Sequence, residues 1–341
     1  MAEAFYTKYR PKEWDEVCSQ DSIIKILRKQ VETKSYKNSY LFSGASGCGK
    51  TTVARIFANK INNGCGIPEE IDAASHNGVE SIREIINSAN ERSLDSEYKI
   101  FIIDECHAIS AQGWQAFLKC IEEPPEYTIF IFCTTEIQKV PDTIKNRCQR
   151  YTFGRIKTDK IIDRLNLICE KEGLRDYQTG IEYIAKLANG GMRTAISCLD
   201  KCAGYDKSIT VPNVLKTLEH YPYELFFRLT DLLFKNDTAG VIKAINYFYN
   251  EGNDLKLFVD QYLNFILDTC KYSIFRNCDL TSLPSTMTDS LNAICTYTDL
   301  DVRLNTCLET LLNLKNLLKN DTFPKNTVEV TFLLLCKKLN P

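Results

Sequence analysis

The sequence has 341 residues, which is too long for one ordinary domain, so we expect two or three. Hydrophobic residues (44%) and charged residues (25%) are balanced as in soluble globular proteins, and the formal net charge is −2. This charge excludes nucleic-acid binding through the field of the whole protein, so that a local basic patch would be needed. No apolar run is long enough to span a bilayer and the N-terminus does not resemble a signal peptide, so we expect a cytoplasmic protein without membrane partners.

The 15 cysteines include no C-x-x-C pair, and several lie within apolar runs. This pattern indicates small buried hydrophobes in a reducing compartment rather than a disulfide framework. Structural zinc usually needs closely spaced ligand pairs. The nearest approach is Cys198 with Cys202, whose helical spacing favours core packing.

The chain opens with a short mixed stretch, residues 6–20, in which Pro11 favours an extended backbone at Arg10. Asp21 is predicted to cap the helix that follows. The apolar face of this helix is made by Ile23, Ile24, Ile26, Leu27 and Val31. The residues alone predict a surface arm followed by a packing helix.

Residues 44–51 read Gly-Ala-Ser-Gly-Cys-Gly-Lys-Thr and match the phosphate-binding P-loop pattern G-x-x-x-x-G-K-[ST]. They lie between a predicted buried strand that includes residues 40–42 and a predicted helix over 52–61, which is the context that the motif requires. Glycines let backbone N–H groups turn toward phosphate oxygens, and the helix N-terminus favours an anion. Lys50 is predicted to reach the β/γ-phosphates and Thr51 to bind Mg²⁺; the alternative is a chance glycine-rich turn. The nucleotide-binding residues predicted in this segment are Gly44, Ser46, Gly47, Cys48, Gly49, Lys50, Thr51 and Thr52.

A second set of candidate site residues follows a later strand. After a short strand around Ile71 and a helix over residues 79–90, residues 98–103 form a nearly continuous apolar strand, as in the middle of a parallel sheet. Ligands of open α/β sheets bind beyond the carboxyl ends of the strands. Asp104 is therefore predicted to hold Mg²⁺ through its water shell, and Glu105 to orient and activate the attacking water. The alternative is a pair of solvated carboxylates.

The rest of this domain alternates helix and strand again. A helix over residues 111–122 is stopped by two prolines, and a buried strand over 127–133 follows. Thr135, just past this strand, is a candidate contact of the γ-phosphate or the lytic water, although the β-propensity of threonine explains it about equally well. Pro141 opens a short helix, and residues 151–153 form the closing strand.

Several motifs occur in order along roughly residues 5–200. They are Y-R-P at 9–11, Val17 with Gln20, the P-loop, I-D-A-A-S at 71–75, D-E-C-H at 104–107, I-E-E-P-P at 121–125, T-T at 134–135 and N-R-C-Q at 146–149. In this combination the sequence resembles the gamma/tau subunits of bacterial DNA polymerase III, the ATPase of the sliding-clamp loader. The motifs at 71–75 and 121–125 are more specific than the ATP motifs, which many AAA+ proteins share. Replication factor C small subunits are similar but usually differ at these two places.

The resemblance implies roles for residues that spacing does not single out. Arg147 matches the arginine finger, which reaches the ATP of a neighbouring subunit, although Asn146 replaces the usual serine before it. Arg193 matches the sensor-2 arginine of the helical lid, which contacts phosphate in its own subunit, although Thr194 replaces the usual acidic residue after it. The arm that covers the adenine in the family matches Arg10, Pro11 and Val17.

The resemblance also implies contacts with DNA. The DNA-facing positions fall on His76, Asn77 and Lys119, of which the first two lie in a loop that is often basic in the family, so their electrostatic contribution is weaker here. The family carries a zinc-binding insert of four cysteines after the P-loop helix. Here Cys65 stands alone, so we predict no zinc.

From about residue 207 the motifs stop and the pattern is helical. A wide apolar stripe over residues 304–318 indicates burial against other helices, either in a self-contained bundle or, as the resemblance favours, in an oligomerisation collar. We predict an α/β AAA+ P-loop domain with a central parallel sheet over residues 1–153. A small helical lid over 154–206 and an all-α collar over 207–341 follow.

The resemblance implies an ATPase subunit of a DNA sliding-clamp loader, with ATP and Mg²⁺ as cofactors, that places a ring clamp on primed-template DNA during replication. Its partners would be copies of itself, delta and delta-prime type subunits, the clamp and DNA, in a bacterial cell or a virus-infected bacterium. The alternatives are a replication factor C-like small subunit, another AAA+ DNA-remodelling motor, and a nucleotide-switched scaffold. The intact Lys50, Thr51, Asp104 and Glu105 argue against a scaffold with a decayed site.

Overall fold

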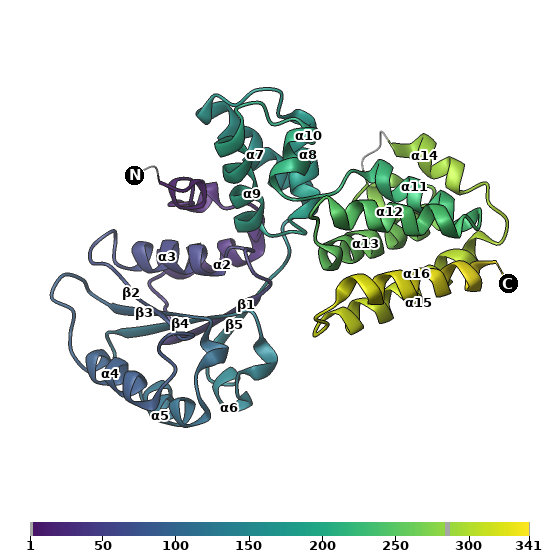
Figure 1. The fold of residues 1–341 in the computed structure, drawn as a ribbon. Coiled ribbons are helices and arrows are strands. Elements are labelled where there is room, and N and C mark those ends of the chain that lie inside the picture. The colour runs from purple at the N-terminus through teal and green to yellow at the C-terminus, as the bar shows by residue number, and fades with distance from the viewer. Residues whose placement is uncertain (1–2, 284–286, 341) are drawn as a thin grey trace. The chain divides into compact units, whose positions relative to one another are not determined.

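The computed structural model of the chain describes residues 3–283 and 287–340. The chain forms two compact units, Met1–Ile209 and Thr210–Pro341. The first contains a parallel sheet with helices on both faces, followed by three further helices, and the second is helical (Figure 1). The AAA+ fold class predicted from the sequence is therefore confirmed, whereas the finer division of the chain into three domains stays a prediction.

The sheet has five strands in the order β2-β3-β4-β1-β5, and every pair of neighbours is parallel. The strands are β1 (Ser39–Gly44), β2 (Glu69–Asp72), β3 (Lys99–Asp104), β4 (Thr128–Thr134) and β5 (Gln149–Phe153). In the register, Ser43 of β1 lies opposite Thr134 of β4, and Ile103 of β3 lies opposite Phe132. The carboxyl ends of β1, β3 and β4 thus meet at one edge.

Alternate residues of the central strands enter two different cores, because side chains of a strand point in turn to opposite faces. One core contains Tyr40, Phe42, Ile100, Ile102, Ile129 and Ile131. The other contains Leu41, Phe101, Ile103, Phe130 and Phe132. Burial on both faces explains why these strands read as continuous apolar runs.

Helices cover both faces of the sheet (Figure 1). Helices α2 (Asp21–Glu32) and α3 (Lys50–Ile61) pack in the first core, and α4 (Val79–Ala89), α5 (Ala111–Glu122) and α6 (Asp142–Lys145) pack in the second. Ser110 caps α5, since its side chain accepts a hydrogen bond from the Gly113 N–H. The remaining short helices of this part are α1 (Phe5–Lys8) and the 3₁₀ turns η1 (Trp14–Glu16), η2 (Cys106–Ala108) and η3 (Ile137–Lys139).

The prediction that Asp21 caps α2 is wrong. Asp21 is the first helical residue, and the cap position is held by Gln20 in a left-handed conformation with φ of +70°. The Gln20 side chain instead donates to the carbonyls of Cys48 (3.3 Å) and Gly154 (2.8 Å). Gln20 therefore ties the P-loop to the chain that leaves β5.

Three helices complete the first unit: α7 (Thr158–Glu172), α8 (Gln178–Leu187) and α9 (Met192–Tyr205). They pack through buried residues that include Ile161, Leu165, Ile181, Ile184 and Leu199. The end of the unit is tied down by two backbone hydrogen bonds, from Arg175 N to Lys207 O and from Ile209 N to Arg175 O.

The second unit contains α10 (Val211–Thr217), α11 (Tyr223–Phe234), α12 (Thr238–Asn250), α13 (Leu255–Phe275), η4 (Cys278–Leu280), α14 (Thr288–Ile294), α15 (Leu300–Leu318) and α16 (Pro324–Leu339). Its core includes five residues of the predicted stripe: Leu304, Cys307, Leu311, Leu314 and Leu318. Among the described residues of both units, we find no helix with the length and apolar character that crossing a bilayer requires.

We predict that Gly180→Ala destabilises the first unit. A Cβ atom at Gly180 would lie 1.9 Å from the carbonyl oxygen of the fully buried Ile209, so α8 would have to move away from its neighbour. The expected loss in the free energy of unfolding, measured by urea denaturation, is about 2–3 kcal/mol. The control is Gly204→Ala in the exposed part of α9, where a Cβ meets nothing within 4 Å and a change of less than about 1 kcal/mol is expected. Equal stability of the two variants would contradict this packing.

Candidate nucleotide-binding site

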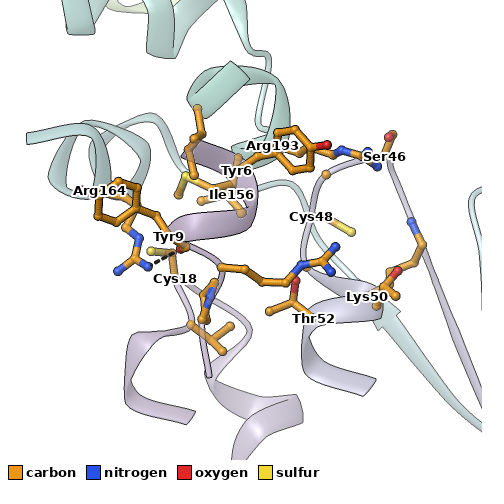
Figure 2. Close-up of a pocket in the computed structure, with 18 of the residues that line it drawn as sticks. Tyr6, Tyr9, Cys18, Ser46, Cys48, Lys50, Thr52, Ile156, Arg164 and Arg193 are labelled. Atoms are coloured by element: carbon orange, nitrogen blue, oxygen red, sulfur yellow. Dashed lines mark hydrogen bonds between the residues drawn. The ribbon is translucent and has the colours of Figure 1, made fainter. Parts of the chain in front are cut away.

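A pocket of about 920 Å³, counting the space open to solvent, lies at the carboxyl edge of the sheet in the first unit. Its wall combines the N-terminal arm, the P-loop, the end of β3 and the helices α7 and α9 (Figure 2). Seven of the eight nucleotide-binding residues predicted from residues 44–52, Ser46 to Thr52, line the pocket, and Gly44 ends β1 outside its lining. Arg10, Pro11, Val17, Asp104, Glu105 and Arg193 line it as well.

Two glycines of the P-loop are required by its backbone. Gly44 has φ of +151°, and a Cβ atom there would lie 2.4 Å from the Phe153 carbonyl oxygen. Gly49 has φ of +103° and stands directly before α3, so the first N–H groups of the helix follow a left-handed residue. Such N–H groups have no partner within the helix and suit an anion.

The Lys50 side chain is buried and bends over the loop. Its ammonium donates to the carbonyls of Gly44 (2.9 Å) and Ala45 (3.0 Å). The loop carbonyls thus hold a positive charge at the pocket, where phosphate oxygens would compete for it.

Thr51 and Asp104 meet although they lie 53 residues apart, because α3 begins beside the end of β3. The Thr51 hydroxyl donates to Asp104 Oδ2 at 2.7 Å, and Asp104 Oδ1 accepts from the Glu105 N–H at 3.0 Å. Hydroxyl and carboxylate oxygens are ligands that suit Mg²⁺, which usually keeps several waters and needs few protein groups. The residues present therefore fit a magnesium nucleotide.

Glu105 has a left-handed backbone, with φ of +45°. Its carboxylate is hydrogen-bonded to Thr135, the residue that follows β4. Its Oε2 accepts from the Thr135 hydroxyl (2.9 Å) and the Thr135 N–H (3.3 Å). Thr135 therefore reaches the site through Glu105 rather than as part of the pocket wall.

Cations line the pocket both from the lid helix α9, with Arg193, and from the N-terminal arm, with Arg10. Met192 at the start of α9 donates its N–H to the Gly47 carbonyl (3.0 Å), which places Arg193 beside the P-loop. The Arg193 guanidinium lies over the Tyr6 ring, 5.1 Å from its centroid, as Figure 2 shows. Burial, and secondarily the charge of Arg55, lowers the pKa of Arg10, so an anion in the pocket would stabilise its charged form.

The arm is fastened to the lid helix α7. Lys8 forms an ion pair with Glu172 (2.6 Å), Tyr9 also donates to Glu172, and Arg164 donates to the Tyr9 carbonyl (2.7 Å; Figure 2). Sequence reasoning missed Arg164 as a lining residue, along with Tyr6, Tyr9, Cys18, Ile156, Met192 and Ile196. Tyr9 lay within a recognised motif, whereas no spacing in the sequence points to Arg164.

Arg147 lies outside the pocket wall, at the end of α6. Its guanidinium pairs with Glu122 (2.5 Å) and donates to the Thr143 carbonyl (2.8 Å), and the side chain is exposed. The other predicted residues away from the pocket, Lys119, His76 and Asn77, are also exposed. The Asn77 carbonyl accepts from the Ser110 N–H (3.4 Å), so the loop with His76 and Asn77 lies against the start of α5, the helix that carries Lys119.

Cys65 is exposed, and among the described residues no group of three or more His, Cys, Asp and Glu side chains is arranged to hold a metal ion. The absence of zinc stays a prediction from the sequence.

Comparison with known proteins finds relatives that match most of the chain. The profile of a family described as DNA polymerase III, delta subunit, matches residues 68–157. A DNA polymerase III subunit gamma/tau of Mycoplasma genitalium is 33% identical over 316 residues, covering 86% of this chain and 53% of that protein. The DNA polymerase III subunit tau of Bacillus subtilis is 34% identical over 292 residues, covering 79% and 52%. The chain spans about half the length of the curated relatives it matches.

Among solved structures, the Thermotoga maritima RuvB Holliday junction branch migration motor has a TM-score of 0.51 at 18% identity, covering 72% of this chain and 86% of that one. The shared parallel sheet, the P-loop and the Asp-Glu pair after β3 define an AAA+ protein, a class of P-loop ATPases. Within this class, the chain is a homologue of the gamma/tau subunits of bacterial DNA polymerase III. The resemblance noted in the motifs is thereby confirmed.

We predict that thiol reagents label Cys65 well before Cys48. Cys65 is exposed, whereas Cys48 in the P-loop is 1% exposed and burial raises the pKa of its thiol. Because the thiolate is the nucleophile, a raised pKa leaves less of it at neutral pH, and labelling of Cys48 should accelerate as pH rises toward that pKa. Mass spectrometry should show at least about tenfold slower labelling of Cys48 at pH 7.

Nucleotide affinity should survive labelling at Cys65 and fall after labelling at Cys48, since Cys48 lines the pocket. Full affinity after stoichiometric labelling at Cys48 would show that this part of the loop does not hold the nucleotide.

Proposed function

We propose that the chain is the ATPase subunit of a DNA sliding-clamp loader, which couples ATP binding and hydrolysis to placing a ring clamp on primed DNA. The observation that carries the proposal is the meeting of Lys50, Thr51, Asp104 and Glu105 at one pocket in a homologue of gamma/tau subunits. Its partners would be copies of itself, delta and delta-prime type subunits, the clamp and primed-template DNA, in the cytoplasm.

The residues divide the work of nucleotide binding by their chemistry. Lys50 and the N–H groups at the start of α3 bind the phosphates, Arg193 adds charge from the lid, and Thr51 with Asp104 holds Mg²⁺. When bound, Mg²⁺ supplies positive charge that favours negative charge on the transferring phosphoryl group. Arg10, Pro11 and Val17 enclose the nucleotide from the arm.

Hydrolysis needs a group that orients a water molecule, and Glu105 is the carboxylate placed for it. Thr135 donates two hydrogen bonds to one oxygen of this carboxylate, and these bonds restrict its rotation. Arg147 lies outside the pocket wall, so it would serve the nucleotide of a neighbouring subunit as an arginine finger. A monomer should therefore hydrolyse ATP poorly.

Lys119, in the last turn of α5, and His76 and Asn77, in the loop that contacts the start of this helix, would face DNA. The exposure of these side chains and the contact of the loop with Ser110, the cap residue of the helix that carries Lys119, support this proposal. Cation contacts with phosphates position DNA without reading its sequence, which suits a protein that acts at any primed site.

The proposal predicts that steady-state ATP hydrolysis rises strongly only when primed-template DNA and the cognate clamp are both present. The assay uses this chain together with partner subunits from the same source. Stimulation by DNA that is indifferent to the clamp would instead indicate a remodelling motor. Tight ATP binding in an assembled complex that never hydrolyses it would indicate a nucleotide-switched scaffold.

We predict that Arg147→Ala chains lower the stimulated ATPase of wild-type chains when the two are mixed before assembly. A variant chain lacks the guanidinium that would reach the ATP of its neighbour. The hydrolysis rate at that neighbouring site should therefore fall by about 10³-fold or more. Arg150→Ala, an exposed arginine three residues further on, is the matched control and should leave the rate unchanged. An assembled mixture that keeps the wild-type rate would show that Arg147 does not act between subunits.

A further inference from the structure

His107 lies between two carboxylates close to the pocket. It belongs to η2, the turn that directly follows β3, and its side chain is only 17% exposed. Its Nδ1 lies 3.2 Å from Glu105 Oε2, and its Nε2 lies 3.3 Å from Glu136 Oε1. Nδ1 also lies 3.2 Å from the hydroxyl of Thr134 at the end of β4. The ring therefore bridges the ends of two neighbouring strands.

The position of the Glu105 carboxylate is set by groups that converge on a single oxygen. Oε2 accepts two hydrogen bonds from Thr135 and has His107 Nδ1 beside it. The backbone below is fixed as well, because Ala108 donates its N–H to the Glu105 carbonyl (2.9 Å) and Cys106 is fully buried. A carboxylate held in this way has little freedom to rotate.

The position of the hydrogen on the His107 ring decides to which carboxylate the ring can donate. A neutral imidazole has one N–H, so it donates either through Nδ1, which faces Glu105 and the Thr134 hydroxyl, or through Nε2, which faces Glu136. Glu136 already has a cation, since Lys139 donates to the same Oε1 at 2.9 Å, and this hydrogen bond lowers the pKa of Glu136. Glu136 thus has a cation beside its carboxylate, whereas Glu105 Oε2 accepts from the uncharged N–H and hydroxyl of Thr135. We therefore assign the ring hydrogen to Nδ1, which lies 3.2 Å from both Glu105 Oε2 and the Thr134 hydroxyl.

We propose that His107 is a positioning residue for Glu105: its Nδ1–H fixes the rotation of the carboxylate that orients the attacking water. This inference rests on the proposed ATPase function of Glu105. The imidazole itself touches neither nucleotide nor water in this scheme. A purely structural role, in which the ring only fastens η2 to β4, makes different predictions for the variants below.

The contact itself can be tested on the nucleotide-free chain, without hydrolysis. Nitrogen NMR of ¹⁵N-histidine-labelled protein reports the hydrogen bond at each ring nitrogen, and His107→Asn identifies the His107 signals among the three histidines. We expect Glu105→Gln to shift the Nδ1 resonance of His107. Glu122→Gln, which removes a carboxylate paired with Arg147 instead, is the control and should leave it unchanged. If the chemical shift of His107 Nδ1 is the same in Glu105→Gln as in the wild type, the proposal is overturned.

The effect on rate is tested by two amide substitutions at His107 in the assembled complex. The amide nitrogen of Asn takes the place of Nδ1, whereas that of Gln takes the place of Nε2. His107→Ala and His107→Gln should lower kcat by about tenfold or more, with KM and ATP affinity within about twofold of wild type. His107→Asn should recover most of kcat, because it restores the donor to Glu105.

Each outcome decides a different question. Wild-type kcat in His107→Ala, or recovery by Gln but not by Asn, would overturn the positioning role while leaving the proposed ATPase function intact. Equal loss in all three variants together with a lower unfolding temperature would establish the structural role instead. A wild-type complex that binds ATP but does not hydrolyse it would remove the proposed function, and the NMR result would then decide the Glu105 contact by itself.

Discussion

The site depends on one constraint, which is that five parallel strands present their carboxyl ends at a single edge of the sheet. The P-loop after β1, the Asp104-Glu105 pair after β3 and Thr134-Thr135 after β4 are far apart in sequence and become neighbours only there. The central strands β1, β3 and β4 are buried on both faces and hold these ends in place. Polar side chains at such an edge need hydrogen-bond partners. The Thr51 hydroxyl donates to Asp104, and the Thr135 hydroxyl donates to Glu105.

A second set of contacts connects the pocket to the segments around it. The N-terminal arm is fastened to α7 through Glu172 and Arg164, and α9 begins with a hydrogen bond from Met192 to the P-loop. A ligand in the pocket would thus touch the arm, the loop and the lid helices at once. Each of these segments is therefore bonded directly to another one. Under the proposed function, these contacts would link the occupancy of the pocket to the position of the arm and the lid helices.

The features that could be predicted from the sequence are those whose signal is local. The P-loop glycines, the apolar strands and the helix over residues 111–122 each follow from a few adjacent residues, and the structure has them within one or two residues of the predicted bounds. The pairing of Glu105 with Thr135 could not be predicted, because it depends on the register between β3 and β4. Gln20 was missed as a bridge for a similar reason, since its partners come from two distant loops.

The contacts of Arg147 contribute too little to the stability of the fold to explain why an arginine stands at this position. Its ion pair with Glu122 is exposed on both sides, and such pairs add little to stability. The guanidinium also donates to the Thr143 carbonyl, so both contacts favour the same orientation of the side chain at the surface. Ordering a long side chain costs conformational entropy, and an exposed ion pair alone offsets little of this cost. Under the proposed function this cost is offset at a subunit interface, where a guanidinium ordered beforehand loses less freedom when it meets the phosphates of a neighbouring site.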